Sequence, residues 1–208
     1  MPTRRHVHTR SISADVYVRD DGLWDVEAEL IDTKGRDFML ATGLRKQGEP
    51  IHHMRMTVTI DEHFNVVAAK GDSLRAPYLG ECKTVESAYG QLVGLNLLKG
   101  FRHAVRERLG GTRGCTHLTE LTNVLPTAAI QAFAGEVLPT HDNADPAAAQ
   151  DETMPWQLDR CRALRVDGPA VAEFYPRWYR PTTSATPSAS NAASIDSTEG
   201  ATPVADEQ

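Results

Sequence analysis

The tripeptide Cys115-Thr116-His117 is the part of the sequence with the clearest capacity for chemistry. The apolar spacing after it predicts a helix that starts directly after Cys115. The thiol would then lie at a helix N-terminus, where unpaired backbone N–H groups and the helix dipole favour the thiolate. A thiolate binds metals or attacks electrophiles, and His117 is near enough in the chain to take part in either chemistry.

One interpretation of these residues is a catalytic site in which Cys115 is the nucleophile and His117 or His52 is the base. A carboxylate would orient the histidine. The candidates for it are Glu49, Glu81 and Glu120. Such a site suits acyl or thioester chemistry on a small molecule, or a hydration–elimination step. The sequence has no nucleophile-elbow, Walker or Rossmann motif, so no named enzyme class is indicated.

A glycine-rich turn precedes the same expected helix. Gly110-Gly111 and Gly114 resemble a loop that cradles a phosphate at a helix N-terminus, and Arg113 could hold an anionic cofactor or small-molecule ligand beside the backbone of Gly114. No strand pattern precedes this loop and no lysine stands in register. The alternative is a plain turn between two helices.

The elements that must position these residues begin with two hairpins. Residues 12–19 and 23–32 alternate apolar and polar side chains, and Asp21-Gly22 between them is a strong hairpin signal. Residues 51–60 and 64–69 show the same alternation around a short polar turn. We therefore expect a sheet of about four strands with antiparallel pairing.

Helical spacing follows the strand patterns. One helix is expected from Thr84 to the break at Gly100, a second over 101–109, and a third after Cys115, which Pro126 would kink or end early. Strands followed by helices predict an α+β domain, with about three helices covering one face of the antiparallel sheet.

Composition divides the chain into five parts. We expect a basic flexible arm at 1–10, the α+β core at 11–135 and a linker at 136–153. The segment 154–180 is rich in aromatic and aliphatic residues, so we expect it to dock on the core. Residues 181–208 are rich in Ser, Thr, Ala and Pro and are expected to be disordered.

The charge and cysteine content limit the class of protein. The formal net charge is -6, so no general attraction to nucleic acid or to an anionic membrane surface is expected. No apolar stretch approaches the ~20 residues of a membrane helix. The three widely spaced cysteines are typical of reduced thiols, which favours a cytoplasmic location. The oligomeric state stays open.

Several phrases of the sequence together resemble one bacterial family, the domain of unknown function DUF 2889. The resemblance covers roughly residues 10–180 and implies a shared fold without implying an activity. The phrases are RDDGLWDVEAELIDTK (19–34), GEPIHHMRMTVTID (48–61), APYLGEC (76–82), GTRGCTHLTEL (111–121) and CRALRVDGPAVAEFYPRWY (161–179).

A remoter resemblance links residues 54–132 to the iron–sulfur scaffold fold of the IscU, NifU and SufE group. The shared order is strand, turn, strand, cysteine, helices, and a second cysteine that opens a late helix. Cys82 and Cys115 match these two cysteine positions. The third cysteine of the scaffolds has no counterpart here, and His52 and His53 lie close to its place.

This second resemblance implies a metal site built from His52, Cys82, Cys115 and His117. Two sulfur and two nitrogen ligands suit zinc, or an iron–sulfur cluster with mixed ligation. The alternative is that the cysteines are small buried side chains and the histidines are hydrogen-bonded. A third hypothesis is a non-catalytic accessory protein, which the plain composition allows.

Overall fold

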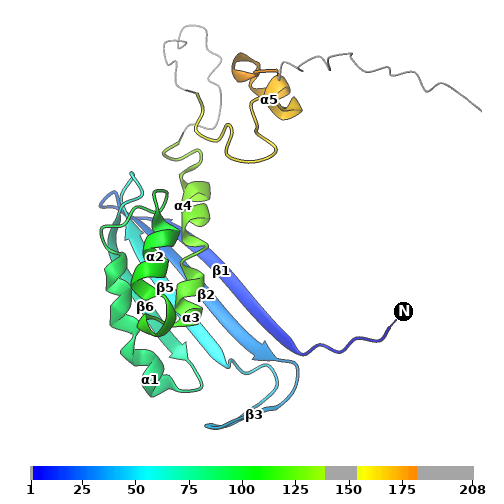
Figure 1. Ribbon diagram of the computed structural model, residues 1–208, viewed down its shortest axis with the longest axis vertical. Coiled ribbons are helices and arrows are strands. Elements are labelled where there is room, and N and C mark those ends of the chain that lie inside the picture. Colours follow the sequence, from blue (N-terminus) through cyan, green and yellow to red (C-terminus); the bar gives the residue numbers. More distant parts are fainter. Residues whose placement is uncertain (1, 139–153, 182–208) are drawn as a thin grey trace, which may run out of the picture. The chain divides into compact units, whose positions relative to one another are not determined.

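The computed structural model describes residues 2–138 and 154–181, and it divides the chain into the units Met1–Trp156 and Gln157–Gln208. The first unit contains a four-stranded antiparallel sheet in the order β1-β2-β5-β6, with helices on one of its faces (Figure 1). The predicted α+β class is confirmed. The elements of this unit are β1 (His8–Val18), β2 (Trp24–Lys34), β3 (Phe38–Leu40), β4 (Gly43–Arg45), β5 (His52–Ile60), β6 (Val66–Arg75), α1 (Leu79–Thr84), the 3-10 helix η1 (Glu86–Leu92), α2 (Phe101–Leu109), the 3-10 turn η2 (Gly111–Arg113), α3 (Thr116–Leu121) and α4 (Leu125–Phe133).

The core lies between the helices and the sheet face turned toward them, which we call the inner face. Alternate side chains of β2 and β5 point to this face, as the period of two in a strand requires. They are Trp24, Val26, Ala28, Leu30, Met54, Met56, Val58 and Ile60, all buried. Phe133 of α4 packs its ring against Trp24 and Phe64, with centroids 4.7 Å and 4.5 Å apart.

Both predicted hairpins are formed. Gly22 closes the β1–β2 turn with φ +81°, a conformation that glycine adopts without steric cost. In the β5–β6 turn, the carboxylate of Asp61 accepts hydrogen bonds from the backbone N–H groups of His63 and Asn65. One strand from each hairpin, β2 and β5, lies in the centre of the sheet beside the other.

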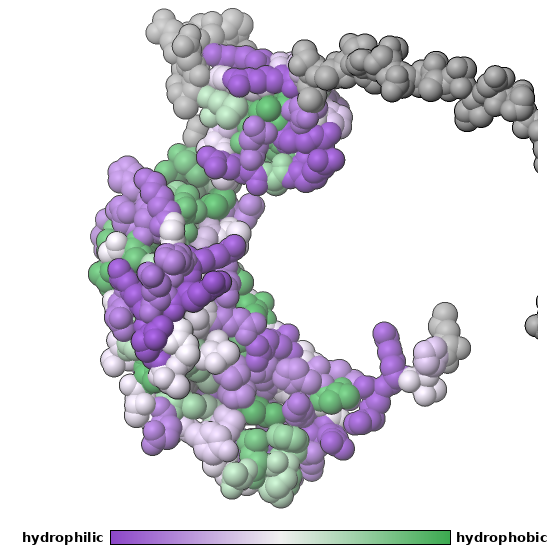
Figure 2. All heavy atoms as spheres, in the orientation of Figure 1, coloured by the Kyte–Doolittle hydropathy of each residue, from purple (hydrophilic) through white to green (hydrophobic). Residues whose placement is uncertain are grey.

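The sequence placed some strand ends incorrectly and did not reveal one hairpin. β1 begins at His8, so the last residues of the expected basic arm belong to the sheet. β6 continues to Arg75, well beyond the predicted end at residue 69. The small β3–β4 hairpin exposes Met39 and Leu44, and Figure 2 shows hydrophobic side chains gathered there, at the lower end of the view.

Two of the predicted helices differ from the structure. α1 already ends at Thr84, whose hydroxyl donates to the Glu81 carbonyl, and the buried Tyr89 and Leu92 belong to η1 instead. The long helix expected after Cys115 forms α3 and α4. Pro126 stands in the first turn of α4, where its missing N–H removes no helical hydrogen bond, so it begins a helix and does not kink one. Helix α2 matches the predicted range 101–109.

The second unit is described by itself over residues 157–181. It contains α5 (Pro169–Phe174) and the 3-10 turn η3 (Pro176–Trp178), and its Leu158 and Val171 are buried. The predicted docking of 154–180 on the core stays a prediction. Most of the expected linker and the expected disordered tail lie outside the described residues.

Candidate functional site

One end of the inner face is polar where the rest of that face is apolar. Arg10 of β1, Asp32 of β2 and His52 of β5 are consecutive cross-strand partners in a single row of the sheet, which we call the polar row. Asp32 continues the alternate positions that bury Leu30, and only 2% of its surface is exposed. The strand period therefore places a carboxylate among the buried side chains, flanked by a cation and an imidazole.

Helix α3 places His117 against this row. The imidazole of His117 stacks on that of His52, with ring centroids 3.8 Å apart and an angle of 26° between the planes. Leu118 and Leu121 hold the buried side of the helix on the core. At its N-terminus, the hydroxyl of buried Tyr89 donates to the Cys115 carbonyl and accepts the Cys115 N–H.

The Asp32 carboxylate is the centre of the polar row. Arg10 donates to both oxygens, from Nε to Oδ1 and from Nη2 to Oδ2, each at 2.8 Å. His52 Nδ1 lies 3.1 Å from Oδ2 and His117 Nε2 lies 3.6 Å from the same oxygen. The Nε2 atom of His8 lies 3.3 Å from Oδ1. One carboxylate thus orients an arginine and three imidazoles.

Burial and charge set the protonation states of this group. Burial raises the pKa of Asp32, but the hydrogen bonds and charge of Arg10 together with the nearby His52 and His8 outweigh it, and the pKa of the carboxyl lies below its usual value. Burial lowers the pKa of His52, and together with the nearby Arg10 and His8 it outweighs the raising effect of Asp32. Burial, His52 and Arg10 together lower the pKa of His117. At neutral pH both imidazoles are therefore neutral, with nitrogen lone pairs free to accept a proton or bind a cation.

The charges of the row leave one negative charge in excess. Arg10 pairs with Asp32 on one side and with Glu120 of α3 on the other, so one guanidinium serves two carboxylates. With His52 and His117 neutral, the guanidinium and the two carboxylates sum to one positive and two negative charges. This balance favours an added cation at the polar row.

The ligand set predicted from the scaffold resemblance falls into two pairs. His52 and His117 meet at Asp32, where one ligand atom from each of the three residues lies within 4.8 Å of the others. Neither cysteine belongs to this group. Cys115 Sγ lies 3.9 Å from His117 Nδ1, on the side of the ring away from Asp32, and Cys82 lines a hollow together with Cys115.

Cys82 and Cys115 line a shallow hollow of about 350 Å³ with Tyr78, Glu81 and Val85. Burial and the neighbouring Cys115 raise the pKa of the Cys82 thiol, which keeps it protonated at neutral pH. Cys161 lies in the second unit and is exposed. Cys82 and Cys115 therefore line a small hollow, and they do not belong to the group of ligand atoms at Asp32.

Packing explains the glycine-rich turn before α3. A Cβ atom on Gly114 would lie 2.6 Å from the Leu109 carbonyl oxygen and 3.1 Å from the Tyr89 hydroxyl, so only glycine fits. Arg113 is exposed, and its Nη2 lies 3.4 Å from the Arg106 carbonyl oxygen. Both residues have a place in the fold without a bound anion, and the predicted cofactor contact stays a prediction.

Sequence reasoning missed Asp32, Arg10 and His8. Asp32 was visible in principle, because it follows Trp24, Val26, Ala28 and Leu30 at the same period of two and so falls on the apolar face of its strand. Arg10 and His8 carried no comparable signal. They were assigned to the flexible arm, and only the strand pairing brings them to Asp32.

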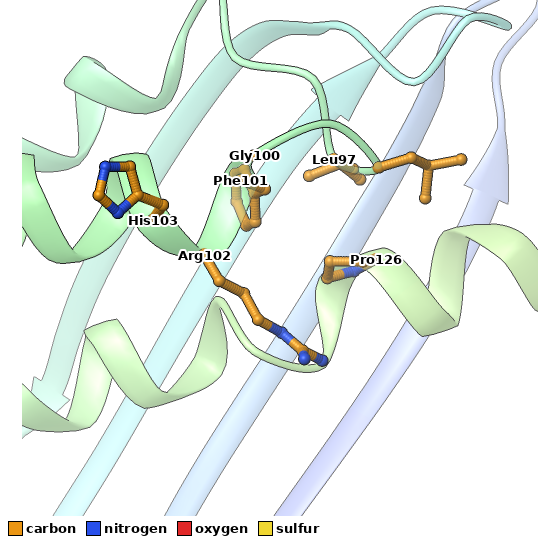
Figure 3. Close-up of a pocket in the computed structure, with 7 residues that line it drawn as sticks. Leu97, Gly100, Phe101, Arg102, His103 and Pro126 are labelled. Carbon is orange, nitrogen blue, oxygen red and sulfur yellow. The ribbon is translucent and has the colours of Figure 1, made fainter.

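A further hollow of about 310 Å³ lies between α2 and the start of α4, lined by Leu97, Phe101 and Pro126. Figure 3 shows Arg102 reaching toward the start of α4 while His103 points away from it. The lining offers one exposed cation and no cluster of ligand atoms. It therefore offers fewer side chains that could bind a metal or a polar ligand than the polar row does.

Comparison with known protein families adds one result. The family model described as "Protein of unknown function (DUF2889)" matches residues 8–131. The chain belongs to this DUF2889 family. The matched range begins with His8 and includes every residue of the polar row, so the candidate site lies inside the family's own domain.

No curated protein and no solved structure matches the chain. The resemblance to iron–sulfur scaffolds therefore stays a prediction. Among the described residues of this DUF2889 protein, no helix is long and apolar enough to cross a membrane.

Proposed function

We propose that the protein binds a divalent transition-metal ion through Asp32, His52 and His117. The observation that carries the proposal is the convergence of one carboxylate oxygen and two imidazole nitrogens within 4.8 Å of one another. Two histidines and one carboxylate form a common donor set for catalytic zinc and for mononuclear iron.

The distances suit such an ion. Metal–ligand bonds of about 2.0–2.2 Å place neighbouring ligand atoms of a tetrahedral site roughly 3.4 Å apart. His52 Nδ1 and His117 Nε2 lie 3.1 Å and 3.6 Å from Asp32 Oδ2. The donor set contains no thiolate, so it favours a single zinc-type ion over an iron–sulfur cluster.

The surroundings of the three residues also support a cation. Lowered histidine pKa values free the nitrogen lone pairs at neutral pH, and Arg10 fixes the orientation of the Asp32 carboxylate as an outer-shell partner. Three protein ligands leave further coordination positions open, which is typical of catalytic rather than structural zinc sites. A metal bound there would act as a Lewis acid on a small molecule.

Metal content and affinity test this proposal directly. Wild-type protein, His52→Ala and His117→Ala are compared with His103→Ala, whose side chain is 76% exposed and forms an ion pair with Glu107 away from the three ligand residues. We expect close to one zinc or cobalt ion per chain in wild type and in His103→Ala, and at least a tenfold weaker affinity in the two site variants. The visible spectrum of the cobalt form should show nitrogen and oxygen ligands without thiolate.

Two results would overturn the metal proposal. One is a wild-type protein that binds neither ion, and the other is a bound metal that disappears in Cys115→Ala while remaining in His52→Ala. Retention of the ion by Cys115→Ala is the outcome that distinguishes the Asp32 site from the cysteine-containing set predicted by resemblance.

A cysteine-dependent enzyme is the second candidate function, and one observation favours it. Cys115 Sγ faces Nδ1 of His117 at 3.9 Å, and Asp32 faces Nε2 of the same ring at 3.6 Å. This is the order of nucleophile, base and orienting carboxylate. A metal-free protein whose Cys115 is alkylated rapidly by iodoacetamide, and slowly in His117→Ala, would favour this candidate.

A further inference from the structure

The two edges of the sheet are built differently. The β6 edge is covered by the segment that follows it: Val66 N–H donates to the Leu95 carbonyl, and Ser73 N–H donates to the Glu86 carboxylate. At the opposite border lies β1, and among the described residues no strand pairs with its outer side (Figure 1). One border is closed by the chain itself and the other is open.

The open strand carries charged side chains such as Arg10, whose guanidinium is paired with Asp32, but it lacks the other features that normally protect an edge. Soluble proteins interrupt exposed edges with proline, lysine, bulges or short strand length. β1 has 11 residues, contains neither proline nor lysine, and pairs with β2 without a register shift. It also exposes large apolar side chains, among them Tyr17 at 53% and Val18 at 65%.

An apolar hollow continues this open edge. Ile12 and Ala14 on the inner face of β1 line a space of about 320 Å³ with Ala128 of α4 and with Val124, which directly precedes that helix. Ile12 is 38% exposed there although its neighbours in the same row of the sheet, Leu30 and Met54, are fully buried. The inner face therefore extends beyond the helices that cover it.

We propose that a second copy of this chain occupies the open edge, with the two β1 strands paired antiparallel around a two-fold axis at Ser13. This register pairs all 11 residues of both strands. Ile12 then faces Ala14 of the second copy and Ser11 faces Asp15 of the second copy, so no like charges are opposed. The same strand serves as both halves of the interface, as a two-fold symmetric contact requires.

The pairing also brings the two apolar hollows together. Each hollow lies beside the centre of its β1 strand, and the two-fold axis passes through that centre at Ser13. Main-chain hydrogen bonds would supply affinity and the joined hollows would bury apolar surface. The product is one continuous eight-stranded sheet with four strands from each copy.

Sedimentation or light scattering over a range of concentrations tests the dimer in the full chain. We expect wild type to be dimeric at micromolar concentration. Ala14→Lys should weaken the dimer at least about tenfold, because it places two lysines close to the two-fold axis. Val67→Lys is the matched control, since Val67 is 44% exposed on β6 and should leave the dimer unchanged.

Cysteine cross-linking tests the register. Ser13→Cys would place two thiols directly opposite each other, whereas Ser11→Cys would face Asp15 of the second copy. We expect a reducible covalent dimer from Ser13→Cys at much higher yield than from Ser11→Cys. A wild type that stays monomeric at about 100 μM, well above the range of stable dimers, would overturn the proposal. So would a dimer that Ala14→Lys leaves intact.

Discussion

The two ends of the inner face obey the same strand alternation and bury opposite kinds of side chain. At one end, Trp24, Ile60, Phe64 and Phe133 form an aromatic and aliphatic cluster. At the other end, the same alternation buries Asp32. Apolar residues at every inner position would satisfy the fold, because burying charged groups costs free energy that their pairing only partly returns. The polar end is therefore the part of the face that folding alone does not require.

Exposure separates the two ends as well. The aromatic cluster is at most 8% exposed, and Phe133 is completely buried. The side chains of His52 and His117 are 21% and 23% exposed although they contact a carboxylate that is almost fully buried. At the polar end the Asp32 carboxylate is buried, whereas the imidazoles of His52 and His117 are accessible to solvent. A small ion or molecule can therefore reach them.

Phe133→Ala should give the largest effect and should act only on the apolar end. Removing a fully buried phenyl ring leaves a cavity between Trp24 and Phe64, so we expect the free energy of unfolding to fall by about 3–5 kcal/mol. Denaturant unfolding measures this loss. Metal affinity of the remaining folded protein should stay within about threefold of wild type, because Phe133 touches none of the three ligand residues.

The matched control for this variant is Phe174→Ala in the second unit, where the side chain is 65% exposed and little stability should be lost. If Phe133→Ala lowered metal affinity as strongly as His117→Ala does, the two ends would be one cooperative unit. The contrast between them would then be wrong.

Tyr89→Phe should give a smaller loss that reaches the polar end. The hydroxyl accepts the Cys115 N–H and also bonds to Thr119, so its removal leaves the start of α3 without these partners. An unsatisfied buried group of this kind costs about 1–3 kcal/mol. Because α3 carries His117, we expect weaker metal binding together with the loss of stability.

Calorimetric metal titration and unfolding of the same samples measure both effects. Tyr179→Phe is the control, since Tyr179 is 37% exposed in the second unit. Loss of stability with unchanged metal affinity would show that His117 keeps its position without the Tyr89 hydroxyl, and it would limit the role of Tyr89 to packing.

The fold could be predicted from the sequence where the signal is periodic and local. Alternation identified β2 and β5, Asp21-Gly22 identified the first hairpin, and helical spacing identified α2. The helix expected from Thr84 was wrong because a 3-10 helix can bury Tyr89 and Leu92 at the same spacing. Apolar positions alone do not distinguish these two helix types.

The candidate site was predictable only in part. His52 and His117 were selected for their chemistry, and the fold brings them together. Their shared partner Asp32 was not predicted, because a carboxylate near the end of a strand is usually taken as the start of a polar turn. The alternation of β2 nevertheless places Asp32 on the buried face. The separation of Cys82 from the histidines depends on how α1 packs beside β6, and no local pattern encodes that distance.

The smallest predicted effect concerns the pH dependence of folding stability, which should differ between the two ends of the inner face. In metal-free protein the folded pKa values of His52 and His117 lie below that of a free histidine, about 6.5. The unfolded chain then binds more protons as the pH falls, so folding stability decreases from about pH 7 toward pH 5. At the apolar end, hydrogen bonds from the Asn65 side chain and from backbone N–H groups outweigh the effect of burial and lower the pKa of Asp61.

The Asp61 contribution is fully present above the unfolded carboxyl pKa of about 3.9, and it is lost only as the pH falls through the lower folded value. Unfolding midpoints of the metal-free, chelator-treated protein between pH 7 and pH 3 measure the histidine and the Asp61 contributions. We expect the double variant His52→Gln/His117→Gln to flatten the slope between pH 7 and pH 5, and Asp61→Asn to change only the steeper phase below about pH 4. An unchanged slope in the double variant would mean that the buried carboxylate, and not the imidazoles, determines the response of the polar end to acid.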